Sequence, residues 1–275
     1  MADDPADFHH SFPRSEGREV FGGDPAGYER ARPGYPERVY ELLVERCGLV
    51  PGTATLEIGP GPGTASMSLI ARGARPYVAV EPDPRLAEHL ESRLRAVPAE
   101  ATVHVQPFED APLGPQSFDL VAAATSFHWI EPKPGLKRVF TLLRPGGWWA
   151  MWWTIFNDPE REDPFHEVTH PLLQRATGEE GPSDEPFVYL QNEERIAELV
   201  GAGFRAPHFE AIRFTRSFTP GEIRDLYATF SPVSRLAAAP RAKLLDDLER
   251  VAADTFGGRV ERPFVTACYV ARRPD

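Results

Sequence analysis

A glycine-rich segment after an apolar run is the part of this sequence whose spacing best suits ligand binding. Residues 59–63 have glycine at every second position, directly after residues 53–58, and Glu57 stands two positions before the first glycine. Glycine allows tight turns and lets the backbone approach a ligand at the carboxyl end of a strand. A dinucleotide fingerprint would need glycine at the position of Thr64. The carboxylate of Glu57 would repel a pyrophosphate but would suit an ammonium group.

A second acidic residue ends the next apolar run. Glu81 follows residues 77–80, and an acid at this place can accept hydrogen bonds from both hydroxyls of a ribose. A ligand with a ribose and a cationic head but no phosphate is S-adenosylmethionine. We therefore predict that Gly59, Gly61 and Gly63 help to bind this cofactor. In the alternative interpretation, these glycines only form a turn.

The apolar pattern predicts the elements that must hold these groups. Alternating or continuous apolar runs indicate strands, and repeats at three and four residues indicate helices. Strands are expected at residues 53–58, 77–80, 102–105, 118–124, 148–155, 209–214 and 264–271. Helices are expected at residues 36–47, 64–72, 84–98, 136–143, 192–200 and 244–256. Strands that alternate with helices predict an α/β fold with a doubly wound, mostly parallel, seven-stranded sheet.

Breaks in this pattern predict four parts of the chain. Residues 1–35 have little periodicity and are expected to form a flexible N-terminal arm that closes over a site. Residues 36–155 form the predicted cofactor-binding core. Residues 156–190 are too long for an ordinary connection, so we expect an inserted cap. Residues 191–275 complete the same domain.

Composition limits the kinds of partner. The chain has 275 residues, with 41 acidic and 30 basic side chains, and a net charge of -11. Nucleic-acid binding needs clustered Lys and Arg, so we expect no nucleic-acid partner. The sequence has neither the pattern of a signal peptide nor a membrane-spanning run, which predicts a cytoplasmic protein without a membrane partner. Cys47 and Cys268 are expected to be buried, reduced thiols.

Longer motifs resemble the class I S-adenosylmethionine-dependent methyltransferases, in particular their type 11 branch. LEIGPGPGTAS at 56–66 is similar to the first motif of that family, and VAVEPDP at 78–84 is similar to its ribose-binding motif. The segments at 108–129 and 142–149 resemble the adenine region with the fourth strand and the turn before the fifth. YERARPGYP, beginning at Tyr28, and FHW, ending at Trp129, are similar to trans-aconitate methyltransferase-like proteins.

The resemblance implies a set of binding residues. The implied cofactor contacts are Tyr28, Arg32, Glu57, Gly59, Gly61, Gly63, Glu81, Pro82, Phe108, Glu109, Ala124 and Thr125. The implied substrate contacts are Tyr35, His128, Trp129 and Trp153. Many relatives have an acid where this chain has Pro107, so the adenine contact falls to the Phe108 backbone and to Glu109 or Asp110.

Two of these residues have more than one interpretation. His128 is the catalytic candidate: it could act as a general base, orient the substrate, or only form a structural hydrogen bond. Methyl transfer can also proceed without a base, because positioning alone can supply about 7 to 11 kcal/mol. Arg32 could bind the methionine carboxylate of the cofactor or an acidic substrate. Its alternative is a surface ion pair with Glu29 or Glu37.

The aromatic run after residue 147 has two expected roles. Alternate residues of a strand face opposite sides. Trp148 and Trp149 are expected in the core, whereas Trp152, Trp153 and Phe156 could form an apolar wall for the substrate.

A zinc-protease string occurs in the predicted cap, but we do not interpret it as a metal site. His166 to His170 reads H-E-x-x-H, which requires both histidines on one helix. Pro171 follows at once and disfavours a helical conformation at His170. Leu173 and Ala176 stand where the extended motif would need glycine and histidine. We therefore predict no bound metal.

The sequence thus predicts transfer of a methyl group from S-adenosylmethionine to a small-molecule acceptor. One alternative is an enzyme of the same fold with different chemistry, because fold alone does not fix function. Another is a non-catalytic protein that binds S-adenosylmethionine or S-adenosylhomocysteine. The acceptor atom and the oligomeric state cannot be predicted from these residues.

Overall fold

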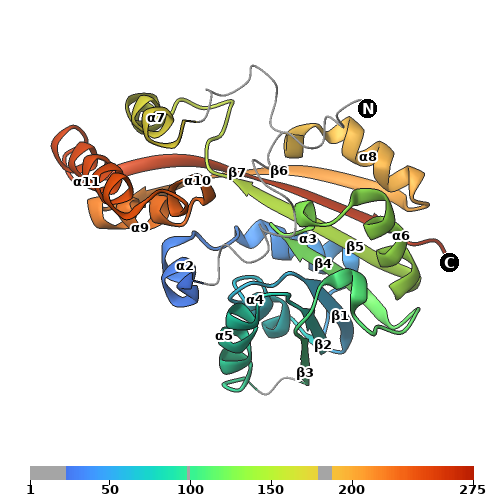
Figure 1. Cartoon of the computed structure of the whole chain (residues 1–275). Coiled ribbons are helices and arrows are strands. Elements are labelled where there is room, and N and C mark those ends of the chain that lie inside the picture. The colour runs from blue at the N-terminus through green and yellow to red at the C-terminus, as the bar shows by residue number, and fades with distance from the viewer. Residues whose placement is uncertain (1–22, 98–99, 179–187) are drawn as a thin grey trace, which may run out of the picture.

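A mixed sheet of seven strands forms the centre of the molecule in the computed structural model, which describes residues 23–97, 100–178 and 188–275. The strands follow the order β3-β2-β1-β4-β5-β7-β6 (Figure 1). They are β1 (Thr53–Ile58), β2 (Ala74–Val80), β3 (Ala101–His104), β4 (Phe118–Ala124), β5 (Leu143–Ile155), β6 (Arg205–Phe218) and β7 (Val260–Arg272). β7 is antiparallel to both of its neighbours, β5 and β6, and all other neighbouring strands are parallel. This confirms the predicted α/β fold with a mostly parallel sheet.

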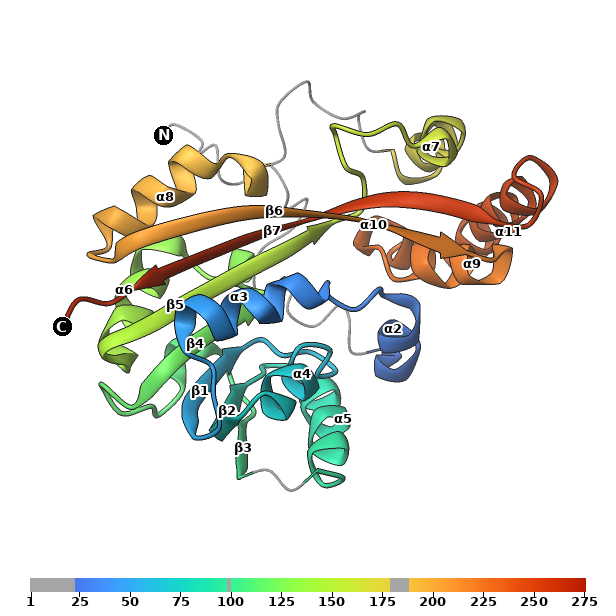
Figure 2. The same ribbon diagram turned by 180° about the vertical axis from the view of Figure 1, so that it is seen from behind.

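Helices cover both faces of the sheet, because successive strand residues point to opposite sides (Figure 2). One face packs on α3 (Glu37–Cys47), α4 (Ser66–Ala71) and α5 (Pro84–Leu94). The other face packs on α6 (Pro132–Leu142) and α8 (Asn192–Gly201). Along β5, Trp149, Met151 and Trp153 contribute to the second core, whereas Ala150 and Trp152 contribute to the first. Two separate apolar cores therefore hold the sheet, one on each face.

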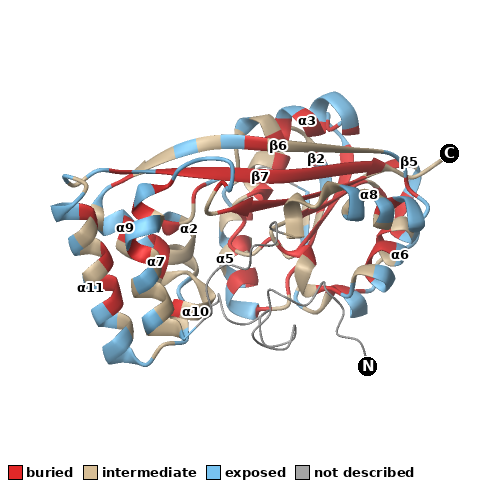
Figure 3. Ribbon diagram, turned by 90° about the horizontal axis from the view of Figure 1, so that it is seen from above, coloured by how far each residue is buried: buried red, intermediate tan, exposed pale blue. Residues whose placement is uncertain are grey.

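A third apolar core joins a group of helices to the far ends of β6 and β7 (Figure 3). We call this group the helical lobe: α7 (Pro164–Thr177), α9 (Pro220–Ala228), α10 (Ser231–Ser234) and α11 (Ala238–Asp254). The helix expected at 244–256 begins earlier, and α9 and α10 were not predicted. The segment expected to form an inserted cap contributes α7, which shares its core with helices from the end of the chain through side chains such as Phe165. Residues 179–187, near the end of that segment, lie outside the described residues.

The N-terminal segment connects the helical lobe to the sheet. Residues 1–22, most of the predicted arm, lie outside the described residues. The helix α2 (Pro25–Ala31) follows, with Asp24 accepting a hydrogen bond from the backbone N–H of Gly27 at 2.8 Å. Such an N-terminal cap favours helix formation. α2 lies between α5 and α9 and contacts both.

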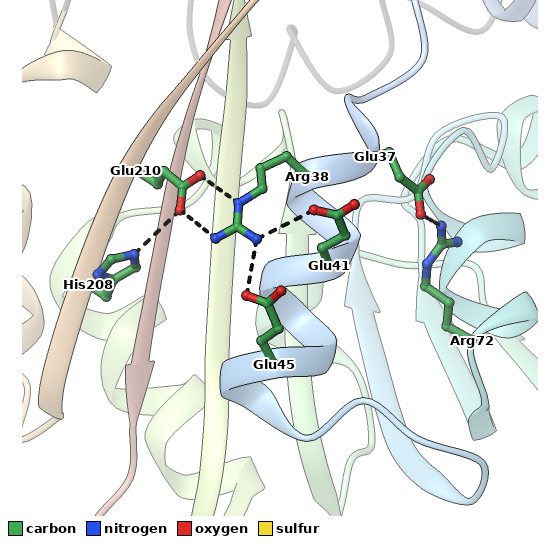
Figure 4. Close-up of polar contacts among 7 residues, drawn as sticks. All are labelled: Glu37, Arg38, Glu41, Glu45, Arg72, His208 and Glu210. Carbon is green, nitrogen blue, oxygen red and sulfur yellow. Dashed lines mark hydrogen bonds and ion pairs between the residues drawn. The ribbon is translucent and has the colours of Figure 1, made fainter.

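Ion pairs fix α3 against the edge of the sheet (Figure 4). Arg38 donates to the carboxylate of Glu210 on β6 at 2.8 and 3.2 Å, and also to Glu41 and Glu45. These side chains are partly exposed, so their contribution to stability is small. Their effect is to orient the helix, whose start places Tyr35 against the site described below.

Proline residues mark several helix starts, and one lies inside a helix. α5 and α6 begin at Pro84 and Pro132, where the missing N–H removes no helical hydrogen bond. α7 continues through Pro171, so His170 is helical although the proline after it was expected to disfavour that conformation. Phe165 and Thr169 are buried inside the helical lobe, and their burial stabilises this helix. Across the described ranges, no helix is long and apolar enough to span a membrane.

Candidate active site

A pocket of about 350 Å³ lies at the carboxyl ends of β1, β2, β4 and β5. Its position is the usual ligand site of a doubly wound sheet, and its size suits a small molecule. α2 and α10 contribute lining residues from outside the sheet. The predicted site residues that line it are Tyr28, Arg32, Tyr35, Gly59, Gly61, Glu81, Pro82, Phe108, Ala124, Thr125, His128, Trp129 and Trp153. The structure thus brings together most of the residues expected from the sequence.

Three predicted contacts do not line the pocket: Glu57, Gly63 and Glu109. The Glu57 side chain is fully buried under the glycine turn, where it accepts hydrogen bonds from Tyr77 at 2.6 Å and Ser66 at 2.8 Å. Burial raises the pKa of Glu57 to about 7. Glu57 thus connects Tyr77 on β2 to Ser66 at the start of α4 and does not line the pocket.

The glycine turn uses conformations and close contacts that side chains would disturb. Gly59, Gly61 and Gly63 have φ values of 62°, 58° and 90°, in the region that favours glycine. A Cβ atom at Gly59 would lie 2.6 Å from the Cβ of Ser126, and one at Gly63 would lie 2.7 Å from Leu90. At Gly61 the same position meets no atom within 4 Å. Gly61 thus leaves open space where the turn borders the pocket.

Glu81 closes the opposite side of this turn. Its carboxylate accepts hydrogen bonds from the backbone N–H groups of Gly61 at 2.9 Å and Asp83 at 3.0 Å. The side chain is 3% exposed, and burial raises its pKa to about 7. Each carboxylate oxygen has a further lone pair. Glu81 can therefore support the turn and still accept hydrogen bonds from hydroxyl groups of a ligand.

Arg32 does not form the alternative surface ion pairs. Its guanidinium donates to the hydroxyl of Thr229 at 2.9 Å and to the carbonyl of Thr229 at 3.1 Å. The same group lies 4.5 Å from the ring centre of Phe156 and 5.3 Å from that of Phe230, within cation–π range. Arg32 therefore borders the pocket and also fixes the N-terminal segment to α9.

Tyr35 and Thr125 form a polar contact at the end of β4. The hydroxyl of Tyr35 donates to that of Thr125 at 3.0 Å. Thr125 has a φ of 54°, an unusual conformation for a threonine. Its backbone N–H donates to the carbonyl of Trp152 at 2.7 Å, which helps to hold this conformation. Strained residues of this kind often occur at functional sites.

Aromatic side chains form the other end of the pocket. Trp153 stacks on Tyr189 with ring centres 4.8 Å apart, and its indole N–H donates to Nδ1 of His128 at 3.1 Å. Phe156 lines the same region. Trp152 does not line the pocket, because it lies on the opposite face of β5 in the core. The expected aromatic wall therefore contains Trp153 and Phe156 but not Trp152.

Several lining residues were missed by the sequence analysis. Tyr189 belongs to the short helix η5 (Val188–Leu190), and Ser231 and Pro232 begin α10. Both helices are too short to give a periodic signal. The sequence contained one indirect signal for them: the predicted cap after residue 155 was expected to lie beside the pocket for the methyl acceptor.

The zinc-protease string adopts the local geometry that the motif requires. His166 and His170 lie on one helix, with ring centres 4.9 Å apart. No group of three or more possible metal ligands was found among the described residues. Neither histidine lines the pocket.

Known proteins share both the sequence motifs and the fold. Residues 56–151 match the family described as a methyltransferase domain. An uncharacterized methyltransferase of Schizosaccharomyces pombe is 28% identical over 234 residues, which cover 84% of this chain and 86% of that protein.

Two solved structures show the same fold. A putative type II methyltransferase from Anaeromyxobacter dehalogenans has a TM-score of 0.59 and 22% identity, over 89% of this chain and 99% of that one. Phosphoethanolamine N-methyltransferase 2 of Haemonchus contortus, in complex with phosphomonomethylethanolamine and S-adenosylhomocysteine, has a TM-score of 0.57 and 15% identity. That match covers 92% of this chain but only 58% of the nematode enzyme.

Proposed function

Because the chain is a class I S-adenosylmethionine-dependent methyltransferase, we propose that it methylates a small molecule bound at the aromatic end of the pocket. The observation that carries this proposal is the division of one pocket into two ends. One end has the glycine turn and Glu81, and the other has Trp153, Tyr189 and Phe156.

The first end fits the cofactor. Gly61 leaves open space beside the turn, and the buried carboxylate of Glu81 can accept ribose hydroxyls. Phe108 and Pro82 line the neighbouring wall and would contact the adenine. When bound, the cofactor supplies a methyl group already activated by its sulfonium. The residues of this chain therefore mainly have to orient an acceptor and exclude water.

The second end supports a small, partly apolar acceptor. Its walls are mostly aromatic, and Arg32 is its permanently charged lining residue. The net charge of -11 also favours a small molecule over a nucleic acid. Cys47 and Cys268 are free, buried thiols, so we further infer that the protein works in a reducing compartment such as the cytoplasm.

A turnover assay against a panel of metabolites tests this function. The full chain is incubated with S-adenosylmethionine and each metabolite, and products are identified by mass spectrometry. We expect at least one acceptor to gain the mass of one methylene while S-adenosylhomocysteine forms. Phe156→Ala is the matched variant: it removes part of the aromatic wall, so acceptor turnover should fall. Because the Phe156 ring also contacts Arg32, affinity for S-adenosylhomocysteine is measured as well and should fall by a smaller factor.

Two results would contradict the proposal. A metabolite that is converted without the mass gain would indicate different chemistry on this fold. Binding of S-adenosylhomocysteine without methylation of any acceptor would favour a non-catalytic binding protein.

A further inference from the structure

The hydrogen bond between Trp153 and His128 defines the state of the imidazole at the acceptor end. His128 lies in the short helix η4 (Phe127–Trp129) directly after β4 and lines the pocket. Its Nδ1 is 3.1 Å from the indole nitrogen of Trp153. An indole N–H can only donate a hydrogen bond, so Nδ1 must accept with its lone pair.

This arrangement determines where the imidazole proton is. A neutral histidine carries one proton, and with Nδ1 accepting, the proton resides on Nε2. A proton on Nδ1 would place two N–H groups against each other at hydrogen-bond distance. The contact therefore disfavours both the other neutral tautomer and the imidazolium.

Trp153 cannot easily turn away from this contact. Its side chain is 4% exposed, stacks on Tyr189 with an interplanar angle of 12°, and meets the edge of Tyr269. Its backbone lies in β5, opposite Ala267 of β7. Packing and sheet pairing thus fix the direction of the indole N–H.

We propose that Trp153 is a positioning residue that holds His128 as a neutral imidazole with its proton on Nε2. Nε2–H of His128 is then a hydrogen-bond donor, and Nδ1 is occupied by the indole N–H and does not act as a general base. Of the three roles that the sequence left open for His128, this assignment favours orienting the substrate, and that part of the inference rests on the proposed function.

Other groups that line the pocket agree with chemistry that needs no base from the chain. Burial raises the pKa of Tyr189 to about 12 and also raises the pKa of Tyr35, so both hydroxyls stay protonated at neutral pH. Glu81 lies at the cofactor end and is engaged by two backbone N–H groups. The acceptors that best suit this pocket are therefore nucleophiles that bind without a proton to lose, or that release it to water.

Nitrogen NMR tests the tautomer without any acceptor. The full chain, labelled with ¹⁵N-histidine, is studied at pH 7 by two-bond ¹H–¹⁵N correlation, and His128→Gln identifies the signals of this residue among the 8 histidines. We expect the pattern of the tautomer protonated at Nε2. The pattern of the other tautomer, or of an imidazolium, would overturn the proposal.

A matched pair of variants tests the cause. Trp153→Phe keeps an aromatic ring but removes the N–H, so the Nδ1 signal of His128 should shift toward the average of two tautomers. Trp129→Phe makes the same change in the ring next to His128, at 4.6 Å between ring centres, and should leave the tautomer unchanged. An unchanged tautomer in Trp153→Phe would show that Trp153 does not set it.

Turnover rates of His128 variants, measured with an acceptor found in the metabolite panel, show whether His128 acts as a hydrogen-bond donor or as a general base. Glutamine can donate from a position near Nε2 but cannot take up a proton, whereas phenylalanine can do neither. We expect both variants to be slower than the wild type, with His128→Gln at least about tenfold faster than His128→Phe. Equal losses of about 100-fold or more in both variants would indicate a general base. The NMR result stands even if no acceptor is found, so failure of the proposed function and failure of this inference are distinguishable.

Discussion

At the scale of single residues, Glu81 connects the glycine turn to the ligand. If its carboxylate accepts the ribose hydroxyls, Glu81→Ala should weaken S-adenosylhomocysteine binding by about 1.5 to 3 kcal/mol, the range for hydrogen bonds to a charged group. Isothermal calorimetry measures this change. Glu45→Ala is the control, because Glu45 pairs with Arg38 on α3 and does not line the pocket. Unchanged affinity in Glu81→Ala, with the fold retained, would remove the ribose assignment.

The second prediction concerns the buried carboxylate of Glu57. Burial raises its pKa in the folded state from 4.5 to about 7, so between these values the folded chain holds a proton that the unfolded chain has lost. The free energy of unfolding should therefore decrease as pH rises from about 5 to 7, by at most about 1.4 kcal/mol per pH unit for this group. In Glu57→Gln this slope should be smaller, as urea unfolding at several pH values can show. An identical slope in variant and wild type would mean that Glu57 does not titrate there.

At the scale of elements, the sequence predicted the strands and helices that have a clear hydrophobic pattern. It missed short helices that are stabilised by contacts with residues distant in the sequence. β1 and β4 were predicted with their observed bounds, and β4 has the nearly continuous apolar run that is typical of a buried parallel strand. α9 and α10 were missed, since they are short and depend on tertiary packing: α9 packs on α11 and β6, and α10 packs on α9. The glycine turn could be found from spacing, but the position of Tyr189 depends on its stacking against Trp153. Local sequence does not encode such a contact.

A buried arginine connects α7 and α9 of the helical lobe to the segment that follows β5. Arg262 on β7 is 1% exposed and donates to Asp163 at 2.6 Å, to the hydroxyl of Tyr227 at 2.6 Å and to the carbonyl of Phe156 at 2.8 Å. Arg262→Met would leave Asp163 buried without its partner, at a cost of about 3 to 5 kcal/mol in the free energy of unfolding. The partly exposed Arg224 pairs with Asp246 in the same lobe, so Arg224→Met should cost less than about 1 kcal/mol. Chemical denaturation measures both changes. Equal losses in the free energy of unfolding for the two variants would contradict the structural role assigned to Arg262.

At the scale of the whole molecule, α2 links the two sides of the pocket. On one side, Glu29 forms an ion pair with Arg93 at 2.7 Å and a hydrogen bond with His89 at 2.8 Å, and both partners lie on α5. On the other side, Arg32 donates a hydrogen bond to Thr229, directly after α9. A short segment held by few polar contacts opens readily, because ordering it costs conformational entropy. A ligand that touches Tyr28 and Arg32 would offset that cost, so the segment would close over the pocket as lids do in other enzymes.

Hydrogen exchange of residues 24–35, with and without S-adenosylhomocysteine, tests this closure. We expect slower exchange in the complex, and a smaller difference in Glu29→Gln, which weakens the contact with α5. Glu37→Gln is the control, because Glu37 pairs with Arg72 away from α2. If exchange of this segment is equally slow with and without the ligand, α2 is a fixed wall of the pocket.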